Sequence, residues 1–562
     1  MYSSIDTMWV LLGAALVFLM QAGFAMLEVG FTRAKNTGNI VMKNVIDVCI
    51  GSLLFWFLGF GIMHGQGGAL FGGIDLFSKG DYSAALPEGI PKAAFLIFQT
   101  VFCATSATIV SGAMAERTKF SAYCIYSAVI SLLIYPVSGH WIWGGGFLEQ
   151  MGFHDFSGSA AVHLAGGCAA FAGAAVLGPR LGKYTKGGSS RGIPGQNPAF
   201  GALGILLLWF SWFGFTGCST LSMTGDGVIA RAADIFVNVN LAAAAAACTT
   251  MFFSWFRYRK PDITLTLNGA LAGLVAVTGC CDAAAPEGAA AIGMLAGFVL
   301  VLAIEFVDKR LKIDDPVGAV SVHGVCGALG TVMTGFLSTE RGLLYGGGFE
   351  LLRVQLLGIL CVAAWSGITA AALFWLIKKT VGLRVDPTAE IEGLDLHEHG
   401  YIGSSALMMP EISWGNEGTE KLPPSAVPAL EEGEGSEIPE EKGRLTRVEI
   451  ITRQEKFEPL KQALNDIGIT GMTVTYVMGC GIQKGMTDYY RGAPLEVQLR
   501  PKVRVDVVVS KVPVREVIDT ARRVLYTGHI GDGKIFIHQV EDAVRVRTGE
   551  TGYDAMQGGN AE

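Results

Sequence analysis

Two histidines lie in apolar segments that are 160 positions apart. His163 follows Ala-Ala-Val and His323 follows Val-Ser-Val, and no charged residue adjoins either of them. A histidine at membrane depth is costly, so each is by default a candidate functional residue. Each ring could instead hydrogen-bond a neighbouring helix and do nothing more. Because the two contexts match, we interpret the pair as one site built from two halves of a repeated fold.

A second set of residues has the chemistry of a small-cation site. Phe215 and Ser219 are four residues apart and so share a helix face, Phe102 belongs to another apolar run, and Trp143 lies just after a third. A ring face attracts a desolvated cation by about 1–2 kcal/mol, and a serine oxygen accepts N–H bonds. Aromatic residues can also form an interfacial belt, but the hydroxyl favours a cation site. We call these four residues the aromatic–serine cluster.

Membrane-spanning helices must position these residues. Of the 562 residues, 51% are hydrophobic, only 16% are charged and 75 are glycine, which suits closely packed membrane helices. We predict eleven apolar runs that are long enough to cross a bilayer. They fall at about 9–31, 45–64, 93–115, 120–142, 159–178, 199–218, 233–256, 263–281, 288–307, 316–337 and 350–377.

The connections between the runs carry unequal numbers of basic residues. Lysine and arginine total fifteen on one side and four on the other, and the basic side is normally cytoplasmic. We therefore predict a multi-pass protein of the inner (cytoplasmic) membrane, with its N-terminus outside and its C-terminal domain in the cytoplasm. His163 falls in the fifth run and His323 in the tenth. Each set of five helices crosses the membrane an odd number of times, so the second set is inverted relative to the first. Inverted repeats of this kind recur in transporters.

The membrane half resembles the ammonium transporter (Amt/Rh/Mep) family over about residues 1–400. The stretches that carry the resemblance are G-A-M-A-E-R-T-K-F, W-G-G-G-F, D-F-S-G-S-A-A-V-H, W-F-G-F-T-G-C-S and D-D-P-V-G-A-V-S-V-H-G-V-C-G. The resemblance implies a homotrimer with one pore through each subunit. It also implies that the aromatic–serine cluster forms or closes the outer ammonium site. Phe102, Phe215 and the twin histidines would line the pore.

The histidine pair has a physical use if ammonium is the substrate. Moving ammonium into hydrocarbon costs many kcal/mol, whereas neutral ammonia enters far more readily. Neutral imidazoles can hydrogen-bond ammonia and take up the proton that ammonium leaves behind. Potassium has a similar radius but cannot lose a proton, so this chemistry would select ammonium.

Asp155 matches an aspartate that the family carries ahead of the first histidine. Two roles are open for it. It could help to deprotonate ammonium, or it could cap amides at a helix start, where carboxylates are favoured. We favour the capping role.

A tail and a linker follow the last apolar run. Residues 381–400 resemble the family's cytoplasmic tail, which packs across the inner face and touches the neighbouring subunit; a disordered tail is the alternative. Residues 401–443 are rich in Pro, Gly, Ser and Glu, a composition that predicts a flexible acidic linker. The predicted domains are therefore 1–400, 401–443 and 444–562.

A soluble α+β domain follows the linker. Strands and amphipathic helices are predicted in the order βαββαβ, a ferredoxin-like plan. R-V-E-I-I-T-R forms the first strand, and the first helix ends at Gly468. The remaining elements are a strand over 472–479, the strand V-R-V-D-V-V-V, a helix over 514–527 and the strand K-I-F-I-H-Q-V.

Two segments of this domain have the chemistry of a phosphate site. T-G-H-I-G-D-G-K, from Thr527 to Lys534, can present amides and a lysine to phosphates, although Gly-Asp-Gly is also a common turn. Arg545 and Arg547 lie two apart on a predicted strand, so both would face one way and add phosphate contacts.

The domain resembles the PII signal-transduction proteins over about residues 445–553. The matching stretches are G-I-T-G-M-T-V-T, Q-K-G-M-T-D-Y-Y-R-G, L-R-P-K-V, T-G-H-I-G-D-G-K-I-F and V-R-V-R-T-G-E. The resemblance implies a trimer with ATP or ADP between subunits and 2-oxoglutarate beside the nucleotide. The residues it assigns to the nucleotide are Thr473, Gly531, Asp532, Gly533, Lys534, Arg545 and Arg547. Gln483 and Lys502 would meet Mg-ATP and 2-oxoglutarate.

Three positions depart from the enterobacterial PII pattern. Ile482 replaces an arginine before the glutamine, which would weaken a nucleotide contact, and His529 replaces a lysine in the Gly-rich loop. Leu495 stands where many relatives carry the tyrosine that is uridylylated, so that modification is not expected at this position.

These observations predict ammonium/ammonia transport that is regulated by a fused PII-like domain sensing ATP, ADP and 2-oxoglutarate. With ADP or little 2-oxoglutarate, the loop at 480–500 would block the cytoplasmic exit, and Mg-ATP with 2-oxoglutarate would withdraw it. The alternative is an ammonium sensor that signals to partners with little net transport. We expect no enzymatic activity, since no nucleophile–base arrangement or metal cluster is found, and no nucleic-acid partner. We expect membrane lipid to surround the apolar helices.

Overall fold

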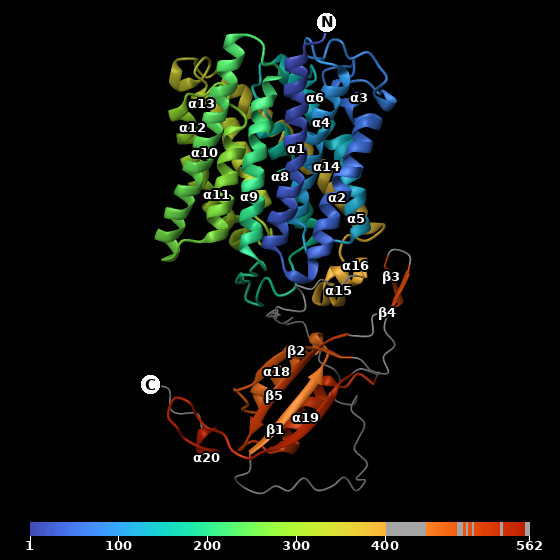
Figure 1. The fold of residues 1–562 in the computed structure, drawn as a ribbon, viewed down its shortest axis with the longest axis vertical. Coiled ribbons are helices and arrows are strands. Elements are labelled where there is room, and N and C mark those ends of the chain that lie inside the picture. Colours follow the sequence, from blue (N-terminus) through green and yellow to red (C-terminus); the bar gives the residue numbers. More distant parts are fainter. Residues whose placement is uncertain (401–444, 480–486, 491–492, 497–499, 529–531, 557–562) are drawn as a thin grey trace. The chain divides into compact units, whose positions relative to one another are not determined.

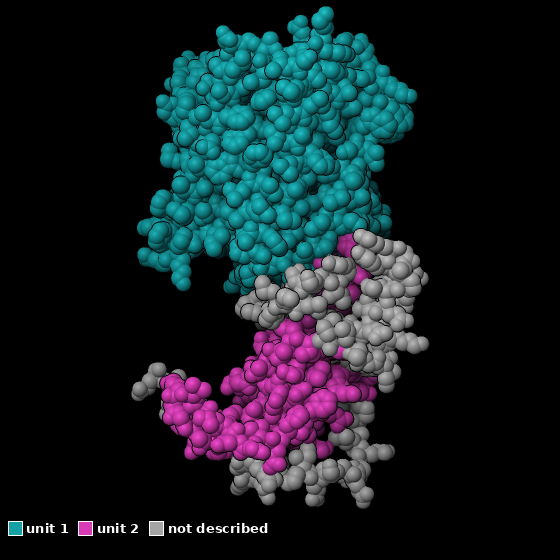
Figure 2. Space-filling model, in the orientation of Figure 1, with its two compact units in different colours: residues 1–184, 188–386 teal, residues 185–187, 387–562 magenta. Residues whose placement is uncertain are grey.

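The computed structural model describes residues 1–400, 445–479, 487–490, 493–496, 500–528 and 532–556. The chain forms two compact units, which Figure 2 shows in different colours. The membrane unit comprises Met1–Tyr184 and Gly188–Asp386, and the second unit comprises Thr185–Gly187 and Pro387–Glu562. The predicted domain boundaries near residues 400 and 444 stay predictions.

The membrane unit is built from long apolar helices that run side by side (Figure 1). Its α-helices are α1 (Ser4–Phe31), α2 (Thr37–Leu54), α3 (Phe60–His64), α4 (Lys92–Ala113), α5 (Phe120–Val129), α6 (Tyr135–Trp143), α7 (Phe147–Gln150), α8 (Ala165–Leu177), α9 (Pro198–Trp212), α10 (Asp226–Tyr258), α11 (Ile263–Val277), α12 (Pro286–Glu305), α13 (Cys326–Leu337) and α14 (Glu350–Lys379). Its π-helical segments are η2 (Phe55–Gly59), η4 (Ile130–Ile134), η5 (Ser159–Leu164), η6 (Phe213–Gly217), η8 (Phe306–Arg310) and η9 (Val320–Val325).

Ten helical stretches among the described residues are long and apolar enough to cross a membrane. They match ten of the eleven predicted runs. The eighth predicted run corresponds to α11, which has only 15 residues. A helix of that length spans about 22 Å, less than the hydrocarbon core of about 30 Å. The count of eleven crossings and the inverted arrangement of two sets of five therefore stay predictions.

Glycine lets α1 and α9 pack with their backbones in contact. A Cβ added to Gly30 would lie 2.3 Å from the backbone nitrogen of Gly201, and one added to Gly204 would lie 2.4 Å from that of Leu27. Both distances are too short for real atoms, so larger side chains would force the helices apart. Close approach through small residues is the usual basis of helix packing in membranes.

A buried charged network joins the connections that follow α1, α4, α8 and η8. Glu116 accepts hydrogen bonds from Arg33 at 2.6 Å and pairs with Arg180 at 3.2 Å. Arg180 also donates to both carboxylate oxygens of Asp314, at 2.8 and 2.9 Å. Burial alone would raise the pKa of Glu116, but the two arginines outweigh it and lower this pKa to about 2. The charges thus hold these loops together without an unpaired carboxylate.

The second unit contains one four-stranded antiparallel sheet. Its elements are α15 (Pro387–Glu392), α16 (Leu394–His399), β1 (Leu445–Thr452), α18 (Phe457–Asp466), β2 (Thr473–Gly479), β3 (Thr487–Tyr490), β4 (Ala493–Glu496), β5 (Arg500–Val509), α19 (Val514–Leu525), β6 (Lys534–Val540) and α20 (Gly552–Ala555). The strand order β2-β5-β1-β6 agrees with the predicted βαββαβ plan. The hairpin of β3 and β4 is an addition within the predicted loop at 480–500.

The core of this unit follows the sequence periodicity. Buried residues alternate along the strands and recur every three or four positions along the helices. They include Val448, Ile450, Val503, Val505, Val507, Leu460, Leu464, Val517 and Ala521. Both α18 and α19 therefore pack on one face of the sheet.

Candidate functional site

The two predicted histidines lie side by side in the interior of the membrane unit. His163 belongs to η5 and His323 to η9, and each segment runs directly into an α-helix. Their Nδ1 atoms are 3.2 Å apart, and their ring centroids are 5.2 Å apart. His163 is fully buried and His323 is 3% exposed. The structure thus brings together two residues that the repeated sequence context had paired.

A contact between two Nδ1 atoms restricts the protons that the rings carry. One nitrogen must donate and the other accept, so two neutral rings hold their hydrogens on different atoms. Among the described residues, His163 Nε2 has no hydrogen-bond partner. It is therefore available to a small molecule that reaches the pair.

Two glycines lie where the histidine segments meet, and one of them allows the close approach. Gly167 lies one turn after His163, and Gly324 directly follows His323. A Cβ added to Gly167 would lie 2.2 Å from the backbone nitrogen of Gly324, so the two backbones touch there. A Cβ added to Gly324 would meet Gly167 only at 3.4 Å, which is an ordinary contact. The missing side chain at position 167 therefore sets the distance between the histidine segments.

Asp155 caps the segment that carries His163. Its carboxylate oxygens accept four hydrogen bonds, from the backbone amides of residues 158–161, at 2.8–3.1 Å. Burial raises the pKa of Asp155, and the amides act against this rise. The geometry is that of a helix cap, the role that we favoured from the sequence. A part in deprotonation stays a prediction.

An equivalent aspartate, which the sequence analysis missed, caps the other segment. Asp315 accepts the amides of residues 318–320 at 2.7–3.1 Å, and burial raises its pKa to about 6. Both segments share the pattern D-x-x-G-x-x-x-V-H. Both glycines of this pattern have positive φ, 111° at Gly158 and 85° at Gly318. Aligning the two histidine segments would have revealed Asp315.

The aromatic–serine cluster adjoins one side of the histidine pair. The rings of Phe102 and Phe215 stack with centroids 4.2 Å apart and planes at 11°. Phe215 lies 5.6 Å from the His163 ring, and Phe102 lies 6.2 Å from the Trp143 ring. The Ser219 hydroxyl donates to the Phe215 carbonyl at 2.7 Å, which leaves its lone pairs free to accept. The Phe102–Phe215 stack thus lies between Trp143 and the histidines.

Trp212 is a second residue that the sequence analysis missed. Its ring stacks on His163 with centroids 5.1 Å apart and planes at 15°. Its Nε1 donates to Thr278 Oγ1 at 2.9 Å, which fixes the orientation of the indole. Trp212 precedes Phe215 by three residues, so the shared helix face was a usable signal.

A small cavity lies on the other side of the pair. Its lining includes His323, Phe24, Glu28, Thr108 and Asn268. It offers about 10 Å³ to the centre of a water-sized molecule, enough for about one water or ammonia. The Phe24 ring is 6.0 Å from the His323 ring. The histidine pair therefore separates the aromatic stack from this cavity.

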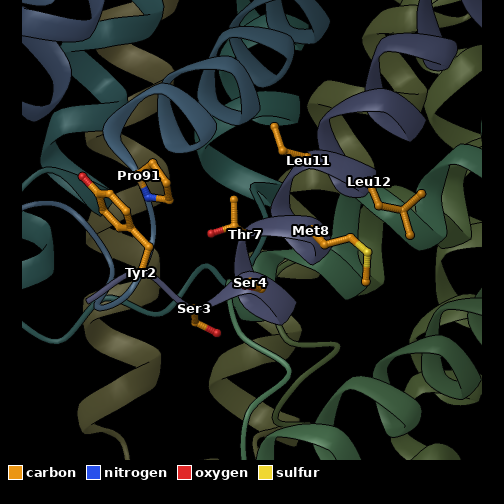
Figure 3. A pocket seen from close by; sticks show the side chains of 8 residues that line it. All are labelled: Tyr2, Ser3, Ser4, Thr7, Met8, Leu11, Leu12 and Pro91. Atoms are coloured by element: carbon orange, nitrogen blue, oxygen red, sulfur yellow. The ribbon is translucent and has the colours of Figure 1, made fainter.

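A larger recess, of about 650 Å³, lies beside the first turns of α1 (Figure 3). It is lined by Tyr2, Ser3, Ser4, Thr7, Met8, Leu11, Leu12 and Pro91. None of the predicted site residues belongs to this lining. We assign it no part in the site.

In the second unit, Asp532 organises the Gly-rich loop. Its carboxylate accepts the Thr527 amide at 2.7 Å and the Thr527 hydroxyl, and it pairs with Arg453 at 3.0 Å. Burial alone would raise the pKa of Asp532, but Thr527 and Arg453 outweigh it and lower this pKa. Gly533 has φ of 125°, and a Cβ there would lie 2.1 Å from the Ile451 carbonyl oxygen. The sequence analysis missed Arg453, which belongs to no Gly-rich motif.

Three predicted ligand residues lie on strands of the sheet. Thr473 begins β2, Lys502 lies in β5 opposite Val477, and Lys534 begins β6. The strands β2 and β6 are the opposite edges of the sheet, roughly 14 Å apart at the usual strand spacing. One chain therefore does not bring Thr473 and Lys534 together.

The predicted strand that carries Arg545 and Arg547 is wrong. Val544 forms only an isolated bridge, and the chain turns back directly after it. The Gly549 amide donates to the Arg545 carbonyl at 2.8 Å, with φ of 73° at Gly549. A glycine that adopts positive φ makes a turn possible where alternating valine and arginine suggested a strand. The two arginines therefore do not face one way along a strand.

The structure does not test the predictions for five further positions. Gln483, Gly531, Ile482 and His529 lie outside the described residues, and Leu495 belongs to β4. Their predicted roles stay predictions.

Known proteins resemble both units. Residues 8–403 match the Ammonium Transporter Family, and residues 445–550 match the Nitrogen regulatory protein P-II family. The ammonium transporter Amt2 of Archaeoglobus fulgidus is 44% identical over 421 residues, covering 71% of this chain and 88% of that protein. The ammonium transporter 1 member 3 of Solanum lycopersicum is 35% identical, covering 71% of this chain and 92% of that protein.

Solved structures show the same membrane fold. A structure described as Sensor Amt Protein has a TM-score of 0.66 and 38% identity, covering 70% of this chain and 98% of its own. The structure of Candida albicans Mep2 has a TM-score of 0.63 and 25% identity, covering 68% of this chain and 87% of its own. The chain therefore belongs to the ammonium transporter family and carries a P-II domain in the same polypeptide.

Proposed function

We propose that the protein moves ammonium across the membrane by deprotonating it at the His163–His323 pair and passing neutral ammonia beyond. The observation that carries this proposal is the 3.2 Å contact between two buried imidazoles. Ammonium is too costly in hydrocarbon to cross as a cation, whereas ammonia is not. A neutral histidine pair can hydrogen-bond ammonia and accept the proton that ammonium loses.

The aromatic–serine cluster forms the outer ammonium site in this proposal. Ring faces replace part of the hydration of the cation, and the Ser219 oxygen accepts one N–H bond. The Phe102 and Phe215 centroids are 4.2 Å apart, so the two rings must separate before ammonium reaches His163. Ammonium can lose a proton at that point and potassium cannot, which gives the selectivity.

The protein acts as a homotrimer with one pore in each subunit, placed in the inner (cytoplasmic) membrane with its N-terminus outside. The unequal basic residues of the connections support this orientation. In the second unit, the edge strand β6 exposes Phe536 and Ile537 by 42% and 44%. An unpaired edge strand with exposed apolar side chains favours contact with another chain, and a second copy of the domain would bury it. Two copies would also bring the two edges, with Thr473 and Lys534, to one ligand.

The P-II domain regulates transport by binding ATP or ADP, with Mg²⁺ and 2-oxoglutarate beside the ATP. The basic donors Lys502, Lys534 and Arg453 suit phosphate and carboxylate groups. The segment at 480–500 blocks the cytoplasmic exit in the ADP state and withdraws with Mg-ATP and 2-oxoglutarate. The composition of residues 401–443 predicts a linker with a reach of about 35 Å, and such a tether would hold the domain at a local concentration of about a millimolar.

A second candidate function is an ammonium sensor whose P-II domain signals to partners with little net transport. The similarity to the structure described as Sensor Amt Protein favours this alternative. The histidine pair is intact in this chain, however, and a sensor that conducts little has no need of a proton acceptor in its interior.

Ammonium current in proteoliposomes distinguishes the two functions. The full chain should carry a sustained current, and the double variant His163→Ala/His323→Ala should carry none. A chain that lacks residues 445–562 should transport without a response to 2-oxoglutarate. An equal response with and without those residues refutes the regulation, and a full chain that binds ammonium without current supports the sensor.

A further inference from the structure

Three ionisable side chains are buried in helices α1 and α2, and one of them lines the small cavity beside His323. Glu28 of α1 is 2% exposed, and Lys43 and Asp47 of α2 are fully buried. Ionisable residues inside a membrane are costly and mark ion or proton pathways. The transport steps proposed above use none of these three residues, so their burial requires its own explanation.

Glu28 connects this group to the histidines. It lines the same cavity as His323, one helical turn beyond Phe24, whose ring lies 6.0 Å from His323. The cavity holds about one water-sized molecule, and one such molecule can bridge two polar groups. Asn268, only 5% exposed, lines the cavity too, and its Oδ1 has no hydrogen-bond partner among the described residues. The cavity thus offers an unused acceptor to a molecule with N–H or O–H groups.

The two buried carboxyls have different surroundings. Asp47 accepts hydroxyl hydrogens on both oxygens, from Thr108 at 2.6 Å and from Ser127, and it does not line the cavity. Glu28 accepts the Ser111 hydroxyl at 2.9 Å and lines the cavity. Glu28 is therefore the carboxyl that can exchange a proton with a molecule inside the cavity.

The charges around Glu28 attract one proton. The charged and titratable groups that act on it from the surrounding elements are Lys43, Asp47, Tyr123, Tyr126 and His323. Lys43 carries one positive charge, and the two carboxyls together carry two negative charges when both are ionised. Because burial disfavours an unbalanced charge, this group takes up one proton again whenever Glu28 has released its own to the inner side.

We propose that Glu28 is the proton acceptor on the inner side of the histidine pair, with the cavity molecule as the bridge. This proposal rests on the proposed function. The imidazole N–H bond breaks as an N–H or O–H bond forms on the bridging molecule, which gives up another of its protons to the Glu28 carboxylate. Glu28 later returns that proton to ammonia or water on the inner side. One ammonium enters and one leaves, so atoms and charge balance.

The test uses the full chain in proteoliposomes and compares the wild type with Glu28→Gln and Glu28→Asp. Glu28→Gln should lower the ammonium-induced current at least tenfold while ammonia still crosses, as measured by the internal pH change after an ammonia gradient. Glu28→Asp keeps the carboxyl and should recover part of the current. A folded Glu28→Gln protein with wild-type current overturns the proposal.

Infrared difference spectra of the wild type keep the proposal testable if Glu28→Gln does not fold. Addition of ammonium should change the carbonyl band of the protonated carboxylic acid, and carboxyl-¹³C glutamate should shift the frequency at which this change occurs. A band that ammonium leaves unchanged, or a frequency shift with labelled aspartate only, overturns the proposal. A wild type that transports no ammonium would instead refute the proposed function, so the two failures are distinguishable.

Discussion

Replacing Gly167 by alanine tests whether a backbone contact sets the distance between the histidines. The added Cβ would lie 2.2 Å from the Gly324 nitrogen, whereas non-bonded atoms prefer about 3.5 Å. The two segments must therefore separate by about 1.3 Å. The Nδ1 atoms of the histidines, now 3.2 Å apart, would then lie more than 4 Å apart, too far for a hydrogen bond by the usual limit of about 3.2 Å.

The expected loss is large because the site depends on position. A displacement of about 1 Å at a reacting centre lowers a rate by roughly 10²-fold, which corresponds to about 2.7 kcal/mol. The assay is ammonium current in proteoliposomes at equal protein density. Gly167→Ala should retain about one hundredth of the wild-type current, with an unchanged elution volume in size-exclusion chromatography.

Gly324→Ala is the matched control for this variant. It adds the same methyl group to the facing segment, where the Cβ meets Gly167 only at 3.4 Å. Its current should remain within about threefold of the wild type, because an ordinary van der Waals contact requires no displacement. Equal losses in the two variants, or full current in a well-folded Gly167→Ala protein, would show that this contact does not set the histidine distance.

Three further perturbations follow from the described contacts. Ser219→Ala removes one acceptor worth about 1 kcal/mol and should raise the half-saturating ammonium concentration about fivefold; an unchanged value contradicts the outer site. Glu116 has a pKa lowered from 4.5 to about 2. The stability that its ionised carboxylate gives to the fold is therefore present above pH 4.5 and is lost as the pH falls towards 2. The melting temperature of the wild type should therefore fall more steeply over that window than that of Glu116→Gln, and parallel curves contradict this. Gly533→Ala puts a Cβ 2.1 Å from a carbonyl oxygen and should abolish ATP binding in calorimetry, whereas Gly528→Ala, with its nearest atom at 3.7 Å, should weaken it less; equal effects contradict the steric argument.

The sequence was sufficient for features that depend on local pattern. Apolar length located the membrane helices, and alternation located the strands of the second unit, because both signals come from neighbouring residues. The histidine pair was predictable because a polar ring at membrane depth is costly and these two occur in matching sequence contexts. Position 167 was not predictable as a spacer, since glycine is common throughout the membrane half and only the facing backbone distinguishes it.

The errors and omissions have equally physical causes. Arg545 and Arg547 alternate with valine as in a strand, yet the positive φ at Gly549 reverses the chain. Trp212 was overlooked because aromatic residues are abundant in this region and its value comes from stacking on His163. Glu28 was overlooked because it lies near the end of an apolar run, where a charged residue is usually at the membrane surface. Its burial becomes evident only once α2 and α4 are packed against α1.

The two histidines are alike in sequence but differ in their neighbours, and this difference gives the proposed pathway a direction. His163 touches Trp212 and Phe215, so its Nε2, which has no hydrogen-bond partner among the described residues, lies on the side where we propose the outer ammonium site. His323 touches Phe24 and lines the cavity that Glu28 also lines. The aspartate caps are alike in the two histidine segments. The difference between the histidines therefore comes from the residues around them. A proton that passes from His163 to His323 would therefore meet acceptors that lie on the opposite side of the pair from the aromatic–serine cluster.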